Sequence, residues 1–369
     1  MQRTLRCAIT LVAASPLVAG ALFAQQTRAA DTTRAGAAQQ RRGADTAQAR
    51  PSTPPKDYRA PLGAPYTAED VTVPTPMGHT LAGTLTIPHG ASRTSKVPAV
   101  VTITGSGAQN RDEELPMLPG YRPFRQFADS LGRRGIAVLR MDDRGTGSSK
   151  GDHAKATSAD FAEDIRAGLA YLRTRPEIDV DRLALMGHSE GGLIGPLVAV
   201  KEPQLKALVV LAGPSWTGRK ILDFQLRNLT NNDTTLKGTK KDSALAAIPG
   251  RIDSLKKTNT WMGFFLDHDV LATARQVKAP TLILNGGTDQ QVTPEQAAEL
   301  AAAIREGGNT DVTAKVFPDM NHLFIYDPVG FPLGYARLTR SSLEPVVVGT
   351  VVDWLALKLG AKASPAAMR

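Results

Sequence analysis

The stretch DRLALMGHSEGGLIG, residues 181–195, joins an apolar run of strand length to a small, apolar segment with helical character. Gly187 and Gly191 flank Ser189 and complete the pattern G-x-S-x-G, in which a strand turns sharply into a helix and presents the serine. Glycine suits such a turn because a side chain there would collide across it. Ser189 is therefore either a nucleophile or a solvated serine in a tight bend. The presence of a base and an acid near it would distinguish the two.

Around this turn the sequence alternates between apolar strands and amphipathic helices. We expect strands at 69–76, 79–88, 97–105, 136–142, 182–189, 205–213, 279–286 and 312–318. Helices are expected at 121–135, 158–175 (capped by Ser158), 191–200, 293–308 and 343–360. Apolar strands that alternate with helices indicate an α/β fold, with a mainly parallel sheet covered by helices on both faces.

Residues 214–278 interrupt the alternation. They are polar and favour helix, and within them residues 228–242 (NLTNNDTTLKGTKKD) have the composition of a mobile, exposed loop. A plain connection of this length is uncommon without a role. We therefore expect a small helical lid insertion over the carboxyl ends of the strands, where open α/β sheets bind their ligands.

A nucleophilic serine needs a base within hydrogen-bond reach and a group that orients the base. The chain holds six histidines. His322 follows the last strand in FPDMNHLF, at the sheet edge where Ser189 emerges. His188 adjoins the serine but is expected to point elsewhere, and His79 and His89 are expected at the surface. His322 is the candidate base.

The candidate acid follows the strand that precedes His322. Asp289 comes after two glycines in PTLILNGGTDQQVTP, so its carboxylate is expected at the same sheet edge. A role for Asp289 as a helix cap is less favoured, because Thr293 before a proline fits that position. Asp267 and Asp269 are competing acids, but they lie within the insertion.

An oxyanion hole needs backbone N–H groups directed at the developing charge. The residue after the nucleophile, Glu190, should supply one, and Ser106 in TGSGAQNRDEE (104–114) should supply the other. The glycine-rich stretches GSG and DRGTGSSKG (143–151) lack the spacing of nucleotide-binding loops. We therefore expect neither a metal nor an organic cofactor.

Composition is that of an ordinary globular protein, with positive charge gathered near the N-terminus. The 369 residues are 42% hydrophobic and 21% charged, with a net charge of +9. Residues 1–60 hold nine Lys and Arg against three Asp, which leaves +3 for the rest. Since no basic stripe interleaved with aromatic residues follows, we expect no nucleic-acid partner.

The first sixty residues indicate an export signal and a linker. Arg3 and Arg6 precede an apolar segment that ends in alanines, which predicts a cleavable signal peptide over residues 1–24. This segment is short and contains Pro16, so no stable membrane span is expected after cleavage. Residues 25–60 predict a disordered linker and residues 61–369 the folded domain. The sequence thus predicts export to the periplasm or the medium; it does not indicate an oligomeric state.

The only cysteine, Cys7, lies within the predicted signal peptide. After its removal the chain has no thiol, which excludes cysteine catalysis and thiolate metal sites.

These motifs together resemble the α/β-hydrolase superfamily, and more narrowly the bacterial esterases that share a serine aminopeptidase-like hydrolase domain. Members carry a GSGPQDRDE-like loop, a DDRGxGxS loop followed by ATSxDFAxD, a GHSEGG turn and a GxxDxQV acid loop. Here the corresponding stretches are GSGAQNRDEE (105–114), DDRGTGSSKG (142–151) with ATSADFAED, GHSEGG (187–192) and GGTDQQV (286–292). The likeness covers roughly residues 65–360 and departs from the pattern at Ala108 and Asn110.

The resemblance implies an α/β-hydrolase fold with Ser189 as nucleophile, Asp289 as acid and His322 as base. It also implies that Asp143 and Arg144 hold the site in place rather than perform chemistry. The predicted function is a serine hydrolase that cleaves a small-molecule carboxylic ester through an acyl-enzyme. A peptidase with the same triad and a catalytically silent binding protein remain the alternatives.

Overall fold

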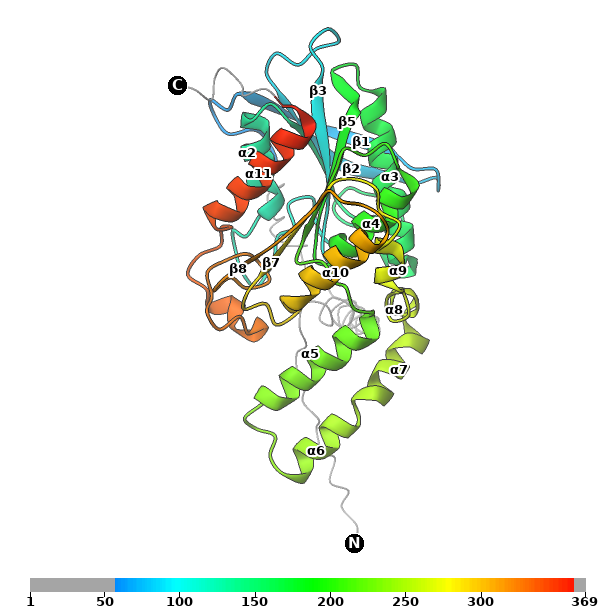
Figure 1. Ribbon diagram of the computed structural model, residues 1–369, viewed down its shortest axis with the longest axis vertical. Helices are drawn as coiled ribbons and strands as arrows, with labels where there is room; N and C mark the ends of the chain where they lie inside the picture. The colour runs from blue at the N-terminus through cyan, green and yellow to red at the C-terminus, as the bar shows by residue number, and fades with distance from the viewer. Residues whose placement is uncertain (1–56, 362–369) are drawn as a thin grey trace, which may run out of the picture.

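A computed structural model describes residues 57–361 of the chain. The predicted signal peptide (1–24) and most of the predicted linker (25–60) lie outside the described residues. One eight-stranded sheet in the order β1-β2-β4-β3-β5-β6-β7-β8 organises the domain (Figure 1). The strands are β1 (Tyr66–Pro74), β2 (Thr80–Pro88), β3 (Val97–Ile103), β4 (Ala137–Met141), β5 (Ile178–His188), β6 (Ala207–Leu211), β7 (Thr281–Gly286) and β8 (Val312–Phe317).

Strand direction follows the predicted pattern. β1 and β2 pair antiparallel, β2 pairs antiparallel with β4, and β4, β3, β5, β6, β7 and β8 run parallel to one another. The inner strands β4, β6 and β7 are buried throughout, and their sequences are mostly apolar, whereas the edge strand β8 is exposed over its central residues. The prediction of a mainly parallel sheet is confirmed.

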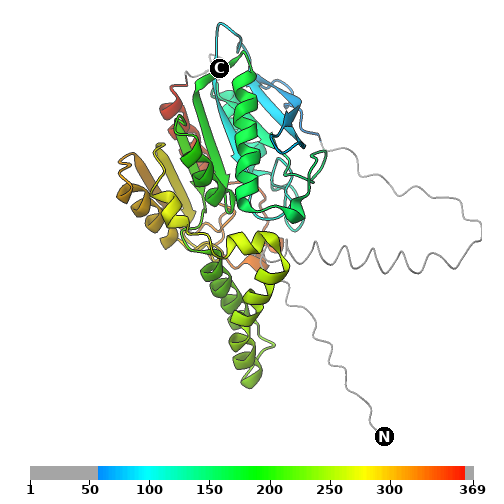
Figure 2. The ribbon, with the colours of Figure 1, turned by 90° about the vertical axis from the view of Figure 1, so that its right-hand side faces the viewer.

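Helices cover both faces of the sheet (Figures 1 and 2). Alternate side chains of each strand enter opposite cores, so that in β5 Leu185 joins the core with α3 and α4, and Met186 joins the core with α2 and α11. The covering helices are α2 (Pro123–Arg133), α3 (Ser158–Thr174), α4 (Gly191–Lys201), α10 (Glu295–Glu306) and α11 (Pro345–Leu359), with short 3₁₀ turns at η2 (His153–Lys155) and η3 (Pro332–Arg337). This is the predicted two-faced α/β architecture.

The insertion between β6 and β7 is helical along most of its length. It consists of α5 (Gly218–Asn232), α6 (Thr239–Ala246), α7 (Ile248–Thr258), α8 (Thr260–Phe265) and α9 (Val270–Ala274). Figures 1 and 2 show α5, α6 and α7 extending away from the sheet as an arm. The exposed loop predicted over 228–242 is confirmed only for residues 233–238, because α5 continues to Asn232 and α6 begins at Thr239. Leu229 and Thr230 are buried in the last turns of α5, so the helix extends into the polar stretch.

Two helix starts also differ from the prediction. Thr157, not Ser158, caps α3, because Thr157 and Asp160 together form a capping box. The α10 helix begins after Pro294 without a side-chain cap, and the Thr293 hydroxyl donates to the Glu295 carboxylate instead (2.6 Å).

Within residues 57–361, none of the helices combines the length and the apolar character needed to cross a bilayer.

Candidate active site

The turn at residues 187–191, which we call the elbow, presents Ser189 at the carboxyl end of β5. Ser189 has a φ of +54°, a left-handed conformation that a non-glycine residue adopts at a cost of about 1–3 kcal/mol. The fold supports it, since the Ser189 N–H donates to the Leu211 carbonyl (2.8 Å). A Cβ on Gly187 would lie 2.0 Å from the Gly191 carbonyl oxygen, and one on Gly191 would lie 2.2 Å from that of Ile103. Both flanking glycines are therefore required by close backbone approach.

His322 and Asp289 meet after β8 and β7. His322 Nδ1 lies 2.7 Å from Asp289 Oδ2, and both side chains are almost fully buried. The other carboxylate oxygen, Asp289 Oδ1, accepts from the N–H groups of Gln291 (2.8 Å) and Val292 (3.0 Å). With these bonds the loop holds the carboxylate in one orientation, so that it faces the imidazole.

Ser189 and His322 border the same cavity, together with Ser106, Gln291 and Tyr121. In the described part of the chain, the Ser189 hydroxyl makes no hydrogen bond to the imidazole of His322. Such bonds are often long in an unliganded enzyme and shorten when substrate binds. The structure thus places the three predicted triad residues at one sheet edge and pairs two of them directly.

The two predicted oxyanion donors border the serine. Ser106 follows β3 and Glu190 follows Ser189, at adjacent strand ends of the parallel sheet. Among residues 57–361, neither backbone N–H donates to a protein acceptor. Both donors are therefore available to an oxygen that develops negative charge beside Ser189.

The Glu190 side chain is buried and connects the elbow to two other segments. Its Oε1 accepts from the Ser158 hydroxyl at the start of α3 and from Trp261 Nε1 in α8, both at 2.6 Å. Burial raises the pKa of the Glu190 carboxyl, and these hydrogen bonds offset only part of that effect. From the sequence only the backbone N–H of Glu190 was expected to have a role, whereas its side chain also connects the insertion to the elbow.

The insertion also contacts the loop that carries the candidate acid. Gln225 in α5 donates to the Gln291 carbonyl (3.0 Å), and Asn228 donates to the Gln290 side chain (2.8 Å). The insertion therefore borders the carboxyl ends of the strands.

Asp143 and Arg144 hold neighbouring loops. Asp143 accepts from the Thr104 hydroxyl and from the Gln109 N–H, both at 2.8 Å, and burial raises the pKa of its carboxyl well above the usual range. Arg144 donates to the carboxylate of Asp164 in α3 (2.6 Å). Neither residue lines the cavity beside Ser189.

Two further residues of the cavity were not predicted. Glu113 and His188 form a second buried pair, with His188 Nδ1 2.8 Å from Glu113 Oε1. His188 Nε2 in turn lies 3.0 Å from the main-chain carbonyl of His322. The available sequence signal was the histidine directly before Ser189 and the acidic run after the glycine loop, but no spacing rule joins residues so far apart.

Of the two histidines expected at the surface, one is exposed and the other is not. His89 is exposed as expected, but His79 packs inward, with Nε2 2.9 Å from Asp164 Oδ1. The turn between β1 and β2 folds against α3, which covers the ring. Within the described residues, no three His, Cys, Asp or Glu side chains converge in an arrangement that could hold a metal ion.

The family model for "Serine aminopeptidase, S33" matches residues 121–329, more than half of the chain. The chain belongs to this family. Its sheet, elbow and covering helices are those of a serine hydrolase with the α/β-hydrolase fold. This S33 membership confirms the resemblance drawn from the sequence motifs.

Relatives of this S33 protein include esterases and peptidases. Esterase EstD of Thermotoga maritima is 27% identical over 298 residues, covering 79% of this chain and 68% of the relative. Dipeptidyl aminopeptidase BIII of Pseudoxanthomonas mexicana is 26% identical over 259 residues, covering 66% of this chain but only 34% of the relative. The alpha/beta hydrolase GrgF of Penicillium sp. sh18 shares the fold at 16% identity, with a TM-score of 0.53 and coverage of 79% and 99%.

Proposed function

We propose that this S33 family member hydrolyses carboxylic esters with Ser189, His322 and Asp289 as its catalytic triad. The observation that carries the proposal is the His322–Asp289 pair (2.7 Å) beside a cavity that also holds Ser189 on its positive-φ turn. Ser106 and Glu190 contribute the oxyanion N–H groups. A serine in a merely solvated bend would need none of these partners.

In the proposed reaction, His322 Nε2 takes the proton of the Ser189 hydroxyl as Oγ attacks the acyl carbon. Asp289 fixes the imidazole with Nδ1 protonated and stabilises its cationic form. The N–H groups of Ser106 and Glu190 bind the oxyanion. The tetrahedral intermediate collapses, His322 gives the proton to the leaving alcohol, and the acyl group stays on Ser189. Water then attacks the acyl-enzyme by the same route and releases the acid.

An ester is favoured over an aminopeptidase substrate by the positions of the acids in the insertion. An exopeptidase needs a group that binds the charged amine of its substrate, and Asp267 and Asp269 are the sequence candidates. Asp267 is exposed and pairs with Lys256, while Asp269 is exposed and caps α9 by accepting from the Ala272 N–H (2.9 Å). Neither borders the cavity beside Ser189. The named likeness to an esterase over most of the chain points the same way.

The test is hydrolysis of p-nitrophenyl butyrate by the wild-type chain and by Ser189→Ala. We expect kcat of the variant to fall by about 10⁴-fold or more, because the covalent step is lost. Ser254→Ala is the matched control, since this hydroxyl lies on α7 and donates only to the Gly250 carbonyl (2.9 Å). Full activity in Ser189→Ala would contradict the proposal.

The peptidase alternative is tested with aminoacyl p-nitroanilides under the same conditions. A higher kcat/KM on the amide than on the ester would favour the peptidase. Labelling with a fluorophosphonate distinguishes either enzyme, esterase or peptidase, from a catalytically silent binding protein, since only an activated Ser189 reacts.

A further inference from the structure

The His188 imidazole is buried between two oxygen atoms. Its Nδ1 faces Glu113 Oε1 at 2.8 Å, and its Nε2 faces the His322 carbonyl oxygen at 3.0 Å. A carbonyl oxygen can only accept, so Nε2 must carry a proton. A second proton lies between Nδ1 and the carboxylate. His188 therefore uses both of its ring nitrogens for hydrogen bonds and has none left for proton transfer with a substrate.

Glu113 extends this chain of bonds to the oxyanion loop, residues 104–114. Its Oε1 accepts from the Gly105 N–H (2.8 Å) in addition to His188. Gly105 directly precedes Ser106, the proposed oxyanion donor. One continuous series of hydrogen bonds thus runs from the oxyanion loop through Glu113 and His188 to the backbone of His322.

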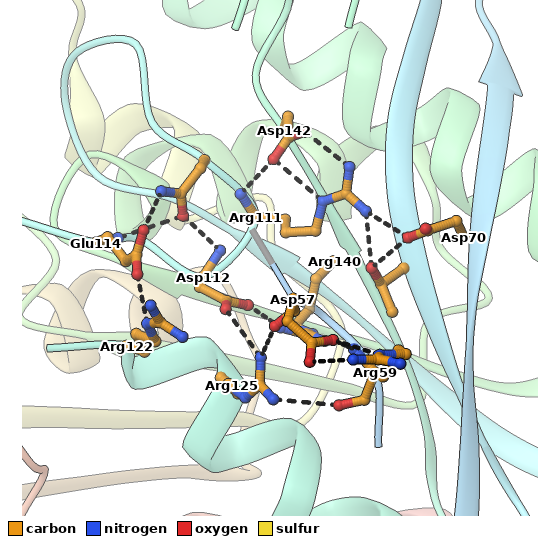
Figure 3. A network of polar contacts seen from close by, with 12 residues as sticks. Asp57, Arg59, Asp70, Arg111, Asp112, Glu114, Arg122, Arg125, Arg140 and Asp142 are labelled. Atoms are coloured by element: carbon orange, nitrogen blue, oxygen red, sulfur yellow. Dashed lines mark hydrogen bonds and ion pairs between the residues drawn. The ribbon is translucent and has the colours of Figure 1, made fainter. Parts of the chain in front are cut away.

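Glu113 itself is held in place by its neighbours in the chain. It has a φ of +58° and is 3% exposed. Figure 3 shows its neighbours in the chain in a network of polar contacts that reaches β1 at Asp70, β4 at Arg140 and α2 at Arg125. The ion pairs of this network join Arg111 to Asp142, Asp112 to Arg140 and Glu114 to Arg122. With both flanks fixed, the carboxylate of Glu113 has one direction available, toward the elbow.

We propose that Glu113 and His188 are positioning residues, which keep the oxyanion donor Ser106 and the base His322 in register with Ser189. The inference rests on the proposed function of these three residues. It is distinct from the triad, because neither Glu113 nor His188 exchanges a proton with the substrate. Misplacing a reacting group by about 1 Å can lower a rate about 100-fold.

The charges around His188 agree with this arrangement. The ionisable groups that face it are Glu113, His322 and, farther away, Asp289. Burial lowers the pKa of the His188 imidazole, but the Glu113 carboxylate and the hydrogen bonds outweigh burial and raise it overall. The shift favours the doubly protonated ring, the form in which both bonds exist together.

The experiment measures the second-order rate of fluorophosphonate labelling, which depends on Ser189, His322 and the oxyanion donors but not on the choice of substrate. In Glu113→Gln the amide oxygen can keep the Gly105 bond without favouring the second proton on His188, or the NH2 can donate to Nδ1 at the expense of the Gly105 bond. Either way the series of bonds is broken at one point. We expect labelling and kcat on p-nitrophenyl butyrate to fall about 10–100-fold, with KM changed less than about threefold.

Glu177→Gln is the matched control. Like Glu113, Glu177 is a buried glutamate with a basic partner, in its case Arg175. It lies at the opposite end of β5 from the elbow. We expect this variant to lose thermal stability without a change in labelling rate. If both glutamine variants lost labelling in proportion to their loss of stability, the positioning role would be overturned.

A second variant, His188→Gln, breaks the same series of bonds from the other side. The double variant Glu113→Gln, His188→Gln should then label within about threefold of the slower single variant, because both remove one connection. Multiplied losses, or wild-type labelling in either folded single variant, would sink the inference while leaving the esterase proposal intact. A wild-type chain that did not label at all would overturn both the positioning role and the esterase proposal.

Discussion

Two histidine–carboxylate pairs lie side by side at the carboxyl ends of the strands, and they differ in one contact. His322 with Asp289 and His188 with Glu113 have Nδ1 to carboxylate distances of 2.7 and 2.8 Å. Their rings are 4.9 Å apart between centroids, and all four residues are buried. Both histidines border the cavity that contains Ser189, but His188 Nε2 meets a main-chain carbonyl, whereas no group of the described residues bonds to His322 Nε2.

This difference separates a residue that can move a proton from one that can only hold a position. Burial, partner type and distance are nearly equal in the two pairs, so none of them identifies the base. The surroundings of the second ring nitrogen favour His322 as the proposed base, since a base needs one nitrogen that is free to accept a proton. A search for histidine–carboxylate pairs alone would find both and could choose either.

The two carboxylates are also fixed in different ways. Asp289 is held by two backbone N–H groups of its own loop, Gln291 and Val292. Glu113 is held by ion pairs of its sequence neighbours with distant strands and a helix (Figure 3). The first arrangement is local, while the second makes the oxyanion loop depend on the rest of the sheet.

The largest expected effect is on the pair that belongs to the proposed triad. Asp289→Asn should lower kcat on p-nitrophenyl butyrate by about 10⁴-fold, since an amide at this position favours the wrong tautomer of His322. This loss should be at least about 100-fold greater than that of Glu113→Gln. Steady-state kinetics of the two variants, each checked for a folded circular dichroism spectrum, provide the measurement. Equal losses would remove the distinction between the pairs.

The next effect concerns stability and the anchoring of the oxyanion loop. Asp112→Asn leaves the guanidinium of Arg140, which is 2% exposed, without its charge partner. Burial already lowers the pKa of Arg140 to about 10, so it stays charged at neutral pH. We expect a loss of about 3–5 kcal/mol in the free energy of unfolding. Urea denaturation followed by tryptophan fluorescence would measure it.

The control for this variant is Asp253→Asn, which removes the partner of Arg219 in the exposed arm. Both of these side chains are about half exposed, so a change of no more than about 1 kcal/mol is expected. Asp112→Asn should also slow labelling of Ser189 where the protein remains folded, because Glu113 loses an adjacent anchor. Comparable stability losses in the two variants would mean that the network in Figure 3 does not hold the loop.

The sequence predicted the features that depend on short-range pattern. Apolar strands alternating with amphipathic helices identified the parallel sheet, and glycine spacing identified the elbow at Ser189. The order serine, acid, histidine then selected Asp289 and His322 from many carboxylates and six histidines. The structure pairs these two, because carboxyl ends of parallel strands share one edge.

The features that were missed depend on contacts between distant residues. Glu113 and His188 are 75 residues apart, and the bond from His188 to His322 spans 134. Ser158 and Trp261 reach Glu190 in the same way from a helix and from the insertion. Tertiary packing brings these residues together, and the local periodicity of the sequence contains no information about it. Likewise, composition predicted a loop over 228–242, but only 233–238 is a loop, because helices α5 and α6 occupy the two ends of the stretch.

The smallest expected effect is a pH dependence that belongs to only one of the pairs. The pKa of His188 in the folded protein is raised above its ordinary value, so folding favours the protonated ring. Its contribution to stability is complete below the unfolded pKa of about 6.5 and is lost as the pH rises through the folded pKa. The difference in unfolding free energy between wild type and His188→Gln should therefore be larger at acidic than at alkaline pH.

We expect that difference to shrink as the pH rises, as measured by urea midpoints at several pH values. Glu113→Gln provides the internal check, because it removes the charge that raises the pKa of His188. In that background the His188→Gln difference should vary much less with pH. A difference that grew with pH would mean that His188 is buried as the neutral ring. It would then lack one of its two N–H donors and could not join Glu113 to His322.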